Sequence, residues 1–406
     1  MRRPSWIILG CISLIILFLY VLLQCIPPLL PAIIDEFHIS YFAGGFLYAI
    51  PILMVAAFTF PLGIVSDRIG STKALGLGAA MVVLFSLLRA TSQSFSSLAF
   101  YTAMLGFGVS LYFPNLPKTV REHFPSHLIG RVTGLYTAAI PLGSGLGISL
   151  SKPLLVITGS WREVVMILSL IAMPLIGVGW IVMKRCKTKI SPESSFPRLE
   201  KPYVHEEKES RCIVDTGDHS FRPVMLCGIL LALLNFAFFI TIGWLPTYLA
   251  SAGWAPVSAG AVTSVISFVE VPAILLVPHL SNRAGRGKLI IMMSFLLISI
   301  CALATLFKPS LTWIAAPVFG MTFGGAFVLL LAFPAQFTKQ EKVGRAAGAI
   351  LAIGYLGGLI GPPLAGYLRD VTGSFFSVFM VMAGVGLIAV CLSARFPYGQ
   401  SSDRVL

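Results

Sequence analysis

Uncharged apolar runs recur along the whole chain, and short polar breaks separate them. Runs of about 20 residues are long enough for a helix to cross a bilayer. They lack the alternation at every second residue that marks a transmembrane barrel strand. The pattern therefore predicts an all-α membrane protein, because a helix satisfies its own backbone polar groups in lipid. The twelve predicted membrane-spanning helices cover residues 6–28, 43–63, 75–91, 98–120, 131–151, 161–183, 223–245, 258–280, 288–308, 312–335, 346–366 and 374–393.

The composition supports a chain that lies mostly in lipid. Of the 406 residues, 57% are hydrophobic and only 11% are charged, whereas about a quarter of the residues of a soluble domain are charged. A chain with so few charged residues cannot cover itself with a surface that faces water. We therefore expect a multi-pass membrane protein.

Lys and Arg residues distribute unevenly between the two sides that twelve spans define. All but five of the 29 lie on the side that carries both termini, and the positive-inside rule makes that side cytoplasmic. We therefore expect a protein of the plasma (inner) membrane with its N- and C-termini in the cytoplasm. Its net charge of +13 then points to membrane lipids, and not to nucleic acid, as the partner. The five exceptions are Arg89, Lys152, Arg162, Lys308 and Arg369.

Residues 184–222 form the only long polar stretch, rich in Pro, Ser, Glu and Lys. This composition predicts a cytoplasmic linker between an N-terminal six-helix bundle, residues 1–183, and a C-terminal six-helix bundle with a short tail, residues 223–406. The spacing of the Cys and His residues in the linker matches no compact metal-ligand pattern. We expect no metal and no other cofactor.

The two predicted bundles are copies of one another. Residues 130–166 and 344–380 align without gaps and share fourteen identities in thirty-seven positions, where roughly three would be expected by chance from ordinary composition. The matches include the pairs Gly130-Arg131 and Gly344-Arg345, and the sequence TGS at 158–160 and 372–374. Because each half holds an even number of spans, the two copies have the same orientation in the membrane.

The stretch PLGIVSDRIGSTKAL, residues 61–75, places charge and glycine between the second and third spans. It contains the pattern G-x-x-x-D-R-x-G-x-x-K, carried by Gly63, Asp67, Arg68, Gly70 and Lys73. A degenerate copy, SNRAGRGK at 281–288, lies between the eighth and ninth spans. Taken with the twelve spans and the internal repeat, this pattern resembles the major facilitator superfamily.

The resemblance implies the major facilitator fold, in which two pseudo-twofold-related six-helix bundles form a monomeric transporter. It also implies that the motif closes a cytoplasmic gate when the protein opens outward. Asp67 can accept hydrogen bonds from a helix N-terminus, and the eleventh span is the neighbour that the family places there. Gly70 supplies a tight turn; in the alternative interpretation, Arg68 and Lys73 serve topology only. The predicted gate residues are Gly63, Asp67, Arg68, Gly70, Lys73, Arg283, Gly285, Lys288, Arg131 and Arg345.

Glycines on the fifth and eleventh spans occur at small-x-x-x-small spacings, which let helix backbones approach closely. We expect them to lie at helix contacts. They are Gly134, Gly143, Gly147, Gly348, Gly357 and Gly361.

Glu270 is the one ionisable residue near the centre of a predicted span. An intramembrane acid is costly and is therefore a functional candidate; Glu270 either binds a proton or cation or pairs structurally. The other polar candidates for substrate binding or coupling at similar depth are Asn235, Tyr20, Gln24, Tyr112, Tyr136 and Tyr355. Each of these is as well explained by helix packing as by contact with a ligand.

The substrate class stays open at this stage. The runs FPNLPKTVREHFP and GWLPTYLASAGW look similar to cyanate-permease-like and nitrate-porter-like branches, which implies a small organic or inorganic anion. Glu270 instead suits protons or a cationic cargo. We expect a secondary transporter that moves a small solute by alternating access, with protons as the coupling ion through Glu270. The alternatives are an efflux transporter for amphipathic or cationic compounds and a transporter-like sensor. No constellation typical of an enzyme is present in the sequence.

Overall fold

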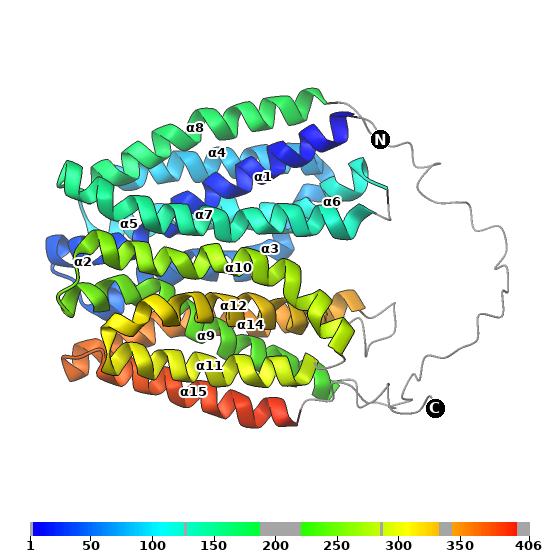
Figure 1. Cartoon of the computed structure of the whole chain (residues 1–406). Helices are drawn as coiled ribbons and strands as arrows, with labels where there is room; N and C mark the ends of the chain where they lie inside the picture. The colour runs from blue at the N-terminus through cyan, green and yellow to red at the C-terminus, as the bar shows by residue number, and fades with distance from the viewer. Residues whose placement is uncertain (1–2, 126–127, 187–220, 285–286, 333–342, 396–406) are drawn as a thin grey trace, which may run out of the picture.

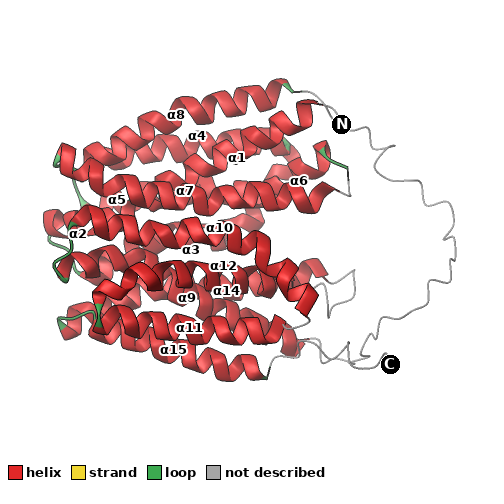
Figure 2. Ribbon diagram, in the orientation of Figure 1, coloured by secondary structure: helices red, strands yellow, loops and turns green. Residues whose placement is uncertain are grey.

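The structure, a computed structural model, describes residues 3–125, 128–186, 221–284, 287–332 and 343–395 (Figure 1). Every regular element among these residues is a helix, as the colouring of Figure 2 shows. The helices of the first half are α1 (Arg3–Gln24), α2 (Ile26–Phe37), α3 (Tyr41–Ile69), α4 (Ser71–Ala90), α5 (Phe95–Ser110), α6 (Tyr112–His123), α7 (Ile129–Thr158) and α8 (Trp161–Arg185). Those of the second half are α9 (Phe221–Ser251), α10 (Pro256–Ala284), α11 (Gly287–Phe307), the short 3-10 helix η3 (Pro309–Leu311), α12 (Thr312–Ala332), α14 (Val343–Thr372) and α15 (Phe376–Ala394).

These helices confirm the twelve predicted spans. Twelve helical segments of the described chain are long and apolar enough to cross a membrane. The first span comprises α1 and α2, and the fourth comprises α5 and α6. Several helices run further than the apolar pattern alone indicated; α7, for example, continues to Thr158 rather than ending at residue 151. Lys152 therefore lies inside a helix and not in a loop.

The first span is interrupted at Cys25, where Pro27 and Pro28 follow. Proline has no backbone N–H, so the carbonyls four residues earlier, of Leu23 and Gln24, lose their helical partners. Arg89 of α4 is 1% exposed, and its Nη2 donates to the Leu22 carbonyl at 2.6 Å. The guanidinium thus holds the break from a neighbouring helix, which explains how an arginine is buried in this half of the protein.

Most packing occurs within each half. In the first half α1 packs against α7 and α8, and α4 packs against α5 and α8. In the second half α9 packs against α14, α10 against α12, and α11 against α15. The two halves meet mainly through two pairs of helices, α3 with α14 and α7 with α10.

The two ends of the described chain lie on one side of the molecule (Figure 1). The side on which α1 begins and α15 ends, at the right of Figure 1, is the termini side, and the other is the opposite side. Helices α3 and α10 run from the opposite side to the termini side, while α7 and α14 run the other way. The predicted orientation, with the termini side in the cytoplasm, stays a prediction.

Candidate transport site

Glu270 lies at the junction of the two halves, in the middle of α10. The residue is 7% exposed, and its Cγ would be 3.0 Å from a Cβ added to Gly324 of α12. The absence of a side chain at Gly324 therefore leaves the room that Glu270 occupies. No hydrogen bond or ion pair joins the carboxylate to another residue that the structure describes.

A tyrosine of the first half lies near this acid. Tyr20 of α1 is a neighbour of Glu270, and it is also a neighbour of Tyr48 on α3 and of Tyr355 on α14. Tyr48 also packs against Phe239 of α9, with ring centroids 6.1 Å apart. The group thus takes side chains from both halves, and it combines one acid with aromatic faces and hydroxyl groups. We call Tyr20, Tyr48, Glu270 and Tyr355 the central group.

The other polar candidates occupy different places. Gln24 lies near the Tyr48 hydroxyl, although not in hydrogen-bonding geometry. Asn235 uses its Nδ2 to donate to the Gly354 carbonyl at 3.0 Å, which ties α9 to α14. Tyr112 packs beside Gly78 of α4, inside the first half, and its buried hydroxyl has no partner among the described residues. Tyr136 is buried on α7, and no contact recorded for it joins it to Glu270.

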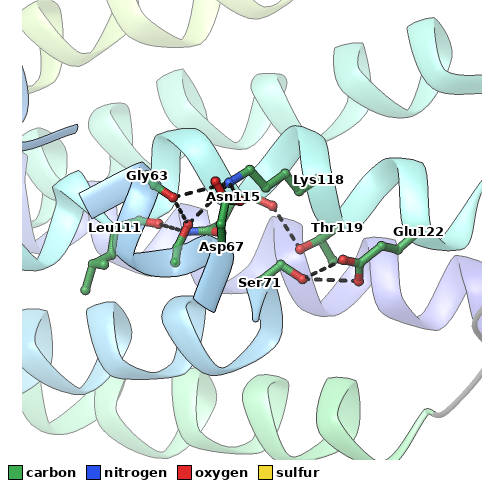
Figure 3. A network of polar contacts seen from close by, with 9 residues as sticks. Gly63, Asp67, Ser71, Leu111, Asn115, Lys118, Thr119 and Glu122 are labelled. Atoms are coloured by element: carbon green, nitrogen blue, oxygen red, sulfur yellow. Dashed lines mark hydrogen bonds and ion pairs between the residues drawn. The ribbon is translucent and has the colours of Figure 1, made fainter. Parts of the chain in front are cut away.

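The predicted gate motif forms a polar network on the termini side, drawn in Figure 3. The Lys118 Nζ of α6 contacts the Asp67 carboxylate at 2.5 Å and the Gly63 carbonyl at 3.4 Å. Beside them, the Ser71 hydroxyl donates to Glu122 at 3.1 Å. In this conformation Asp67 is therefore paired within the first half, and the contact expected with the N-terminus of α14 is not made by described residues.

The glycines of the motif differ in what they do. Gly70 has φ of 88° and ends α3 directly before α4 begins, so this position has the tight turn that a glycine allows. A Cβ at Gly63 would meet only ordinary van der Waals contact, 3.5 Å from Pro114. Arg68 and Lys73 are exposed. The side chains of Arg283, Gly285 and Arg345 lie outside the described residues, as does most of the 184–222 linker.

The predicted packing glycines also divide into two groups. A Cβ at Gly143 or Gly357 would lie 2.2 Å and 1.8 Å from backbone carbonyl oxygens of α1 and α9, so neither position has space for a side chain. Gly147 and Gly361 are similarly close to neighbouring carbonyls, at 2.6 Å and 3.0 Å. In contrast, the nearest atom to a Cβ at Gly134 is 3.9 Å away, and a Cβ at Gly348 would have no neighbour within 4 Å.

On the opposite side, an acid that sequence reasoning missed joins the two halves. The Asp370 carboxylate, near the end of α14, accepts hydrogen bonds from the backbone amides of Tyr41 and Phe42 at 2.9 and 2.8 Å. These amides are the first two of α3, where the helix dipole favours a negative charge. Arg369 lies over the Tyr41 ring, 5.1 Å from its centroid. A signal existed in the sequence: Arg369 and Asp370 align with the apolar Leu155 and Val156, so they break the repeat.

The α3–α14 pair is consequently tight on the opposite side and loose on the termini side. A Cβ at Gly45 would be 2.2 Å from the Pro362 carbonyl oxygen, and one at Gly366 would be 2.2 Å from that of Tyr41. At Gly348, near the other end of α14, no atom outside its own helix lies within 4 Å of such a Cβ. The described halves therefore close on the opposite side and part toward the termini side.

Lys152 is a second residue that sequence reasoning did not place among the site residues. It lies on α7 where this helix meets Gly260 of α10, and it is 4% exposed. No hydrogen bond or ion pair links its ammonium to another described residue. Its position under the repeat corresponds to Gly366, so this charge too is present in one copy only.

Comparisons with known proteins agree with this architecture. The family model described as Major Facilitator Superfamily matches residues 12–362. The chain is 26% identical to the Bacillus subtilis protein named uncharacterized transporter YycB, covering 100% of this chain and 95% of that protein. It is 25% identical to the hexuronate transporter of the same organism, covering 90% and 88%. It is 23% identical to the cyanate transport protein CynX of Escherichia coli, covering 93% and 94%, so the resemblance to cyanate permeases is confirmed.

The fold comparison gives the same result. A solved structure of a D-xylose-proton symporter superposes with a TM-score of 0.77 at 14% identity, covering 98% of this chain and 99% of the symporter. Because the family model covers most of the chain and the twelve-helix fold agrees, the chain belongs to the Major Facilitator Superfamily.

Proposed function

We propose that this protein is a secondary active transporter of the plasma membrane that moves a small anion by alternating access, with Glu270 carrying the coupling proton. The observation that carries this proposal is the placement of Glu270: a buried acid without a partner among the described residues, at the junction of the two halves. A buried carboxylate without a counter-ion is expensive in a membrane. A proton removes that cost, so a proton cycle at Glu270 fits its position.

The alternating-access part of the proposal is supported by the uneven contact between the halves. Tight backbone contacts lie at one end of the α3–α14 pair and are missing at the other. Closure at one side with separation at the other is what a protein captured in one of two access states presents. With the predicted orientation, this state opens toward the cytoplasm.

The anion part of the proposal is supported by the relatives. The names of the hexuronate transporter and of the cyanate transport protein both state anionic solutes. A second candidate, efflux of an amphipathic or cationic compound, is favoured by the central group itself, because an acid with a neighbouring tyrosine ring suits a cation. The two candidates predict different behaviour of one variant.

The test is Glu270→Gln in proteoliposomes. If Glu270 carries the coupling proton, the variant loses accumulation driven by a pH gradient but keeps exchange of substrate between the two sides. If Glu270 binds a cationic substrate, accumulation and exchange fall together. Thr322→Val, which removes a buried hydroxyl that is bonded within α12 and spares the acid, is the matched control. Full pH-driven accumulation by a stably folded Glu270→Gln protein would overturn both candidates.

A further inference from the structure

Lys152 gives the junction of the halves a buried positive charge, and we infer that it binds the anionic group of the transported solute. This inference rests on the proposed function and deepens it, because it identifies what makes the solute an anion. In this arrangement Glu270 carries the proton and Lys152 binds the solute.

The first support is that the lysine is buried and does not snorkel. Lys152 lies six residues before the end of α7, close enough to the membrane surface for an ammonium to reach water. A lysine that did so would expose its charged end, yet the whole residue is only 4% exposed. The side chain is therefore almost entirely covered by protein, where a charge that lacks a partner is costly.

The second support is the absence of a protein counter-ion among the described residues. On the opposite side, Glu36 is paired with Arg162, and Asp370 accepts from the first amides of α3. The remaining acids of that side, Asp35 and Glu163, make no ion pair with Lys152. A buried cation that lacks an acid from its own chain is suited to an acid that arrives from outside.

The third support is the seam between α7 and α10. Lys152 and Gly145 are seven residues apart, two helical turns, and thus share one face of α7. Gly145 packs against the Phe268 ring of α10, and Lys152 packs against Gly260, so this face is the one that meets the other half. The lysine therefore lies where the two halves separate when the opposite side opens, at the entry to the central group.

The fourth support is a free hydroxyl on the facing helix. The Ser267 Oγ of α10 is buried and has no hydrogen-bond partner among the described residues, whereas Thr263 and Ser264 are bonded to their own helix. Ser267 follows Gly260 by two turns and so shares its face. Side chains of α7 tilt toward its N-terminal end, and Ser267 lies in that direction along the contact between α7 and α10. An anion that moves along this contact from Lys152 would meet the Ser267 hydroxyl as a second donor.

The ligand class that this pair selects is a small carboxylate or another compact monoanion. An ammonium is a strong hydrogen-bond donor to such groups, and the Ser267 hydroxyl adds a second donor without adding charge. Glu270 lies one turn beyond Ser267 on α10, so an anion in this place is disfavoured while Glu270 is ionised. Anion entry and protonation of Glu270 would thus favour one another.

The experiment measures binding to the purified full-length protein in detergent by calorimetry. The probes are the monoanions D-glucuronate and 3-phenylpropionate, with D-glucose and 3-phenylpropanamide as their uncharged counterparts. Wild-type protein should bind at least one acid more tightly than its counterpart. Lys152→Met should weaken that binding by about tenfold or more, as loss of a charge-assisted hydrogen bond implies, and Lys152→Arg should largely retain it. Lys308→Met, which removes an exposed lysine, should leave it unchanged.

Folding does not confuse this test, because removal of an unpaired buried charge should not lower the melting temperature. Equal acid binding by wild-type protein and Lys152→Met would overturn the inference, and so would wild-type protein that binds none of the acids. Failure of the proposed function has a different signature: an acid that binds through Lys152 but is not moved across proteoliposome membranes.

Discussion

Each end of the α3–α14 pair combines an acid with a helix N-terminus, but the acid contacts that N-terminus at one end only. Each helix carries an acid near its own C-terminal end, Asp67 on α3 and Asp370 on α14. Because the helices run in opposite directions, each acid lies on the side of the molecule where the other helix begins. On the opposite side Asp370 accepts from the first amides of α3. On the termini side Asp67 is paired with Lys118 of its own half instead.

The difference shows how one pair of helices can hold either of two conformations. A helix N-terminus attracts an anion, so each end has a built-in attachment, but rigid helices that touch at one end and part at the other can form only one at a time. The resemblance to the family predicted the attachment at Asp67. The structure contains the reciprocal one at Asp370.

The largest expected effect comes from filling the tight end. Gly366→Leu places a side chain where a Cβ alone would be 2.2 Å from the Tyr41 carbonyl oxygen, so the opposite side cannot close as it does here. We expect the variant to lose transport almost completely and to favour the conformation that is open on the opposite side. Accessibility of single cysteines on that side to a membrane-impermeant thiol reagent measures this.

Gly348→Leu is the matched control at the loose end, where no neighbour lies within 4 Å of a Cβ. It should fold normally and leave the opposite side inaccessible to the reagent. Equal reagent accessibility in the two variants would show that the tight and loose ends do not differ in the way described.

A smaller effect is expected from Asp370→Asn, which removes the negative charge but keeps the shape. Charge and capping at an exposed helix N-terminus contribute about 1 kcal/mol, so the balance between conformations should shift by about fivefold toward opening of the opposite side. Asp35→Asn, a change at an exposed acid on the same side, is the control. If the thiol reagent labels single cysteines on the opposite side at the wild-type rate in both variants, the Asp370 contact does not hold the halves together.

The smallest effect on this conformation is expected from Asp67→Asn. Its ion pair with Lys118 is substantially exposed, with side-chain exposures of 66% and 38%, and such pairs contribute about 0–1 kcal/mol. The melting temperature should therefore hardly change. Transport should fall, because the other conformation loses its predicted attachment to α14. Uptake at the wild-type rate with normal expression would contradict a gating role for Asp67.

Much of the fold was accessible from the sequence, because apolar runs report directly on the number of spans. The family resemblance rested in addition on the G-x-x-x-D-R-x-G-x-x-K pattern and on the internal repeat. Helix ends were less accessible: the apolar pattern ended α7 at residue 151, and this placed Lys152 outside a helix that in fact buries it.

The site was predicted less completely, for a physical reason. Glu270, Tyr20 and Tyr355 were found because polar groups at mid-span are unusual, and the structure brings them together. Asp370 lies close to a predicted helix end, where charge is ordinary, and only its partner on a distant helix makes it informative. Tyr112 lies at a similar depth but packs beside Gly78 of α4, because depth alone does not say which way a side chain points.

The most direct test of the reciprocal arrangement is a pair of distance measurements by electron spin resonance. One pair of labels replaces the exposed Phe46 and Tyr367 on the opposite side, and the other replaces the exposed Ile64 and Ala349 on the termini side. Asp370→Asn should lengthen the first distance and shorten the second, while Asp67→Asn should do neither or the reverse. Two distances that change in the same direction, or that ignore both variants, would contradict the account.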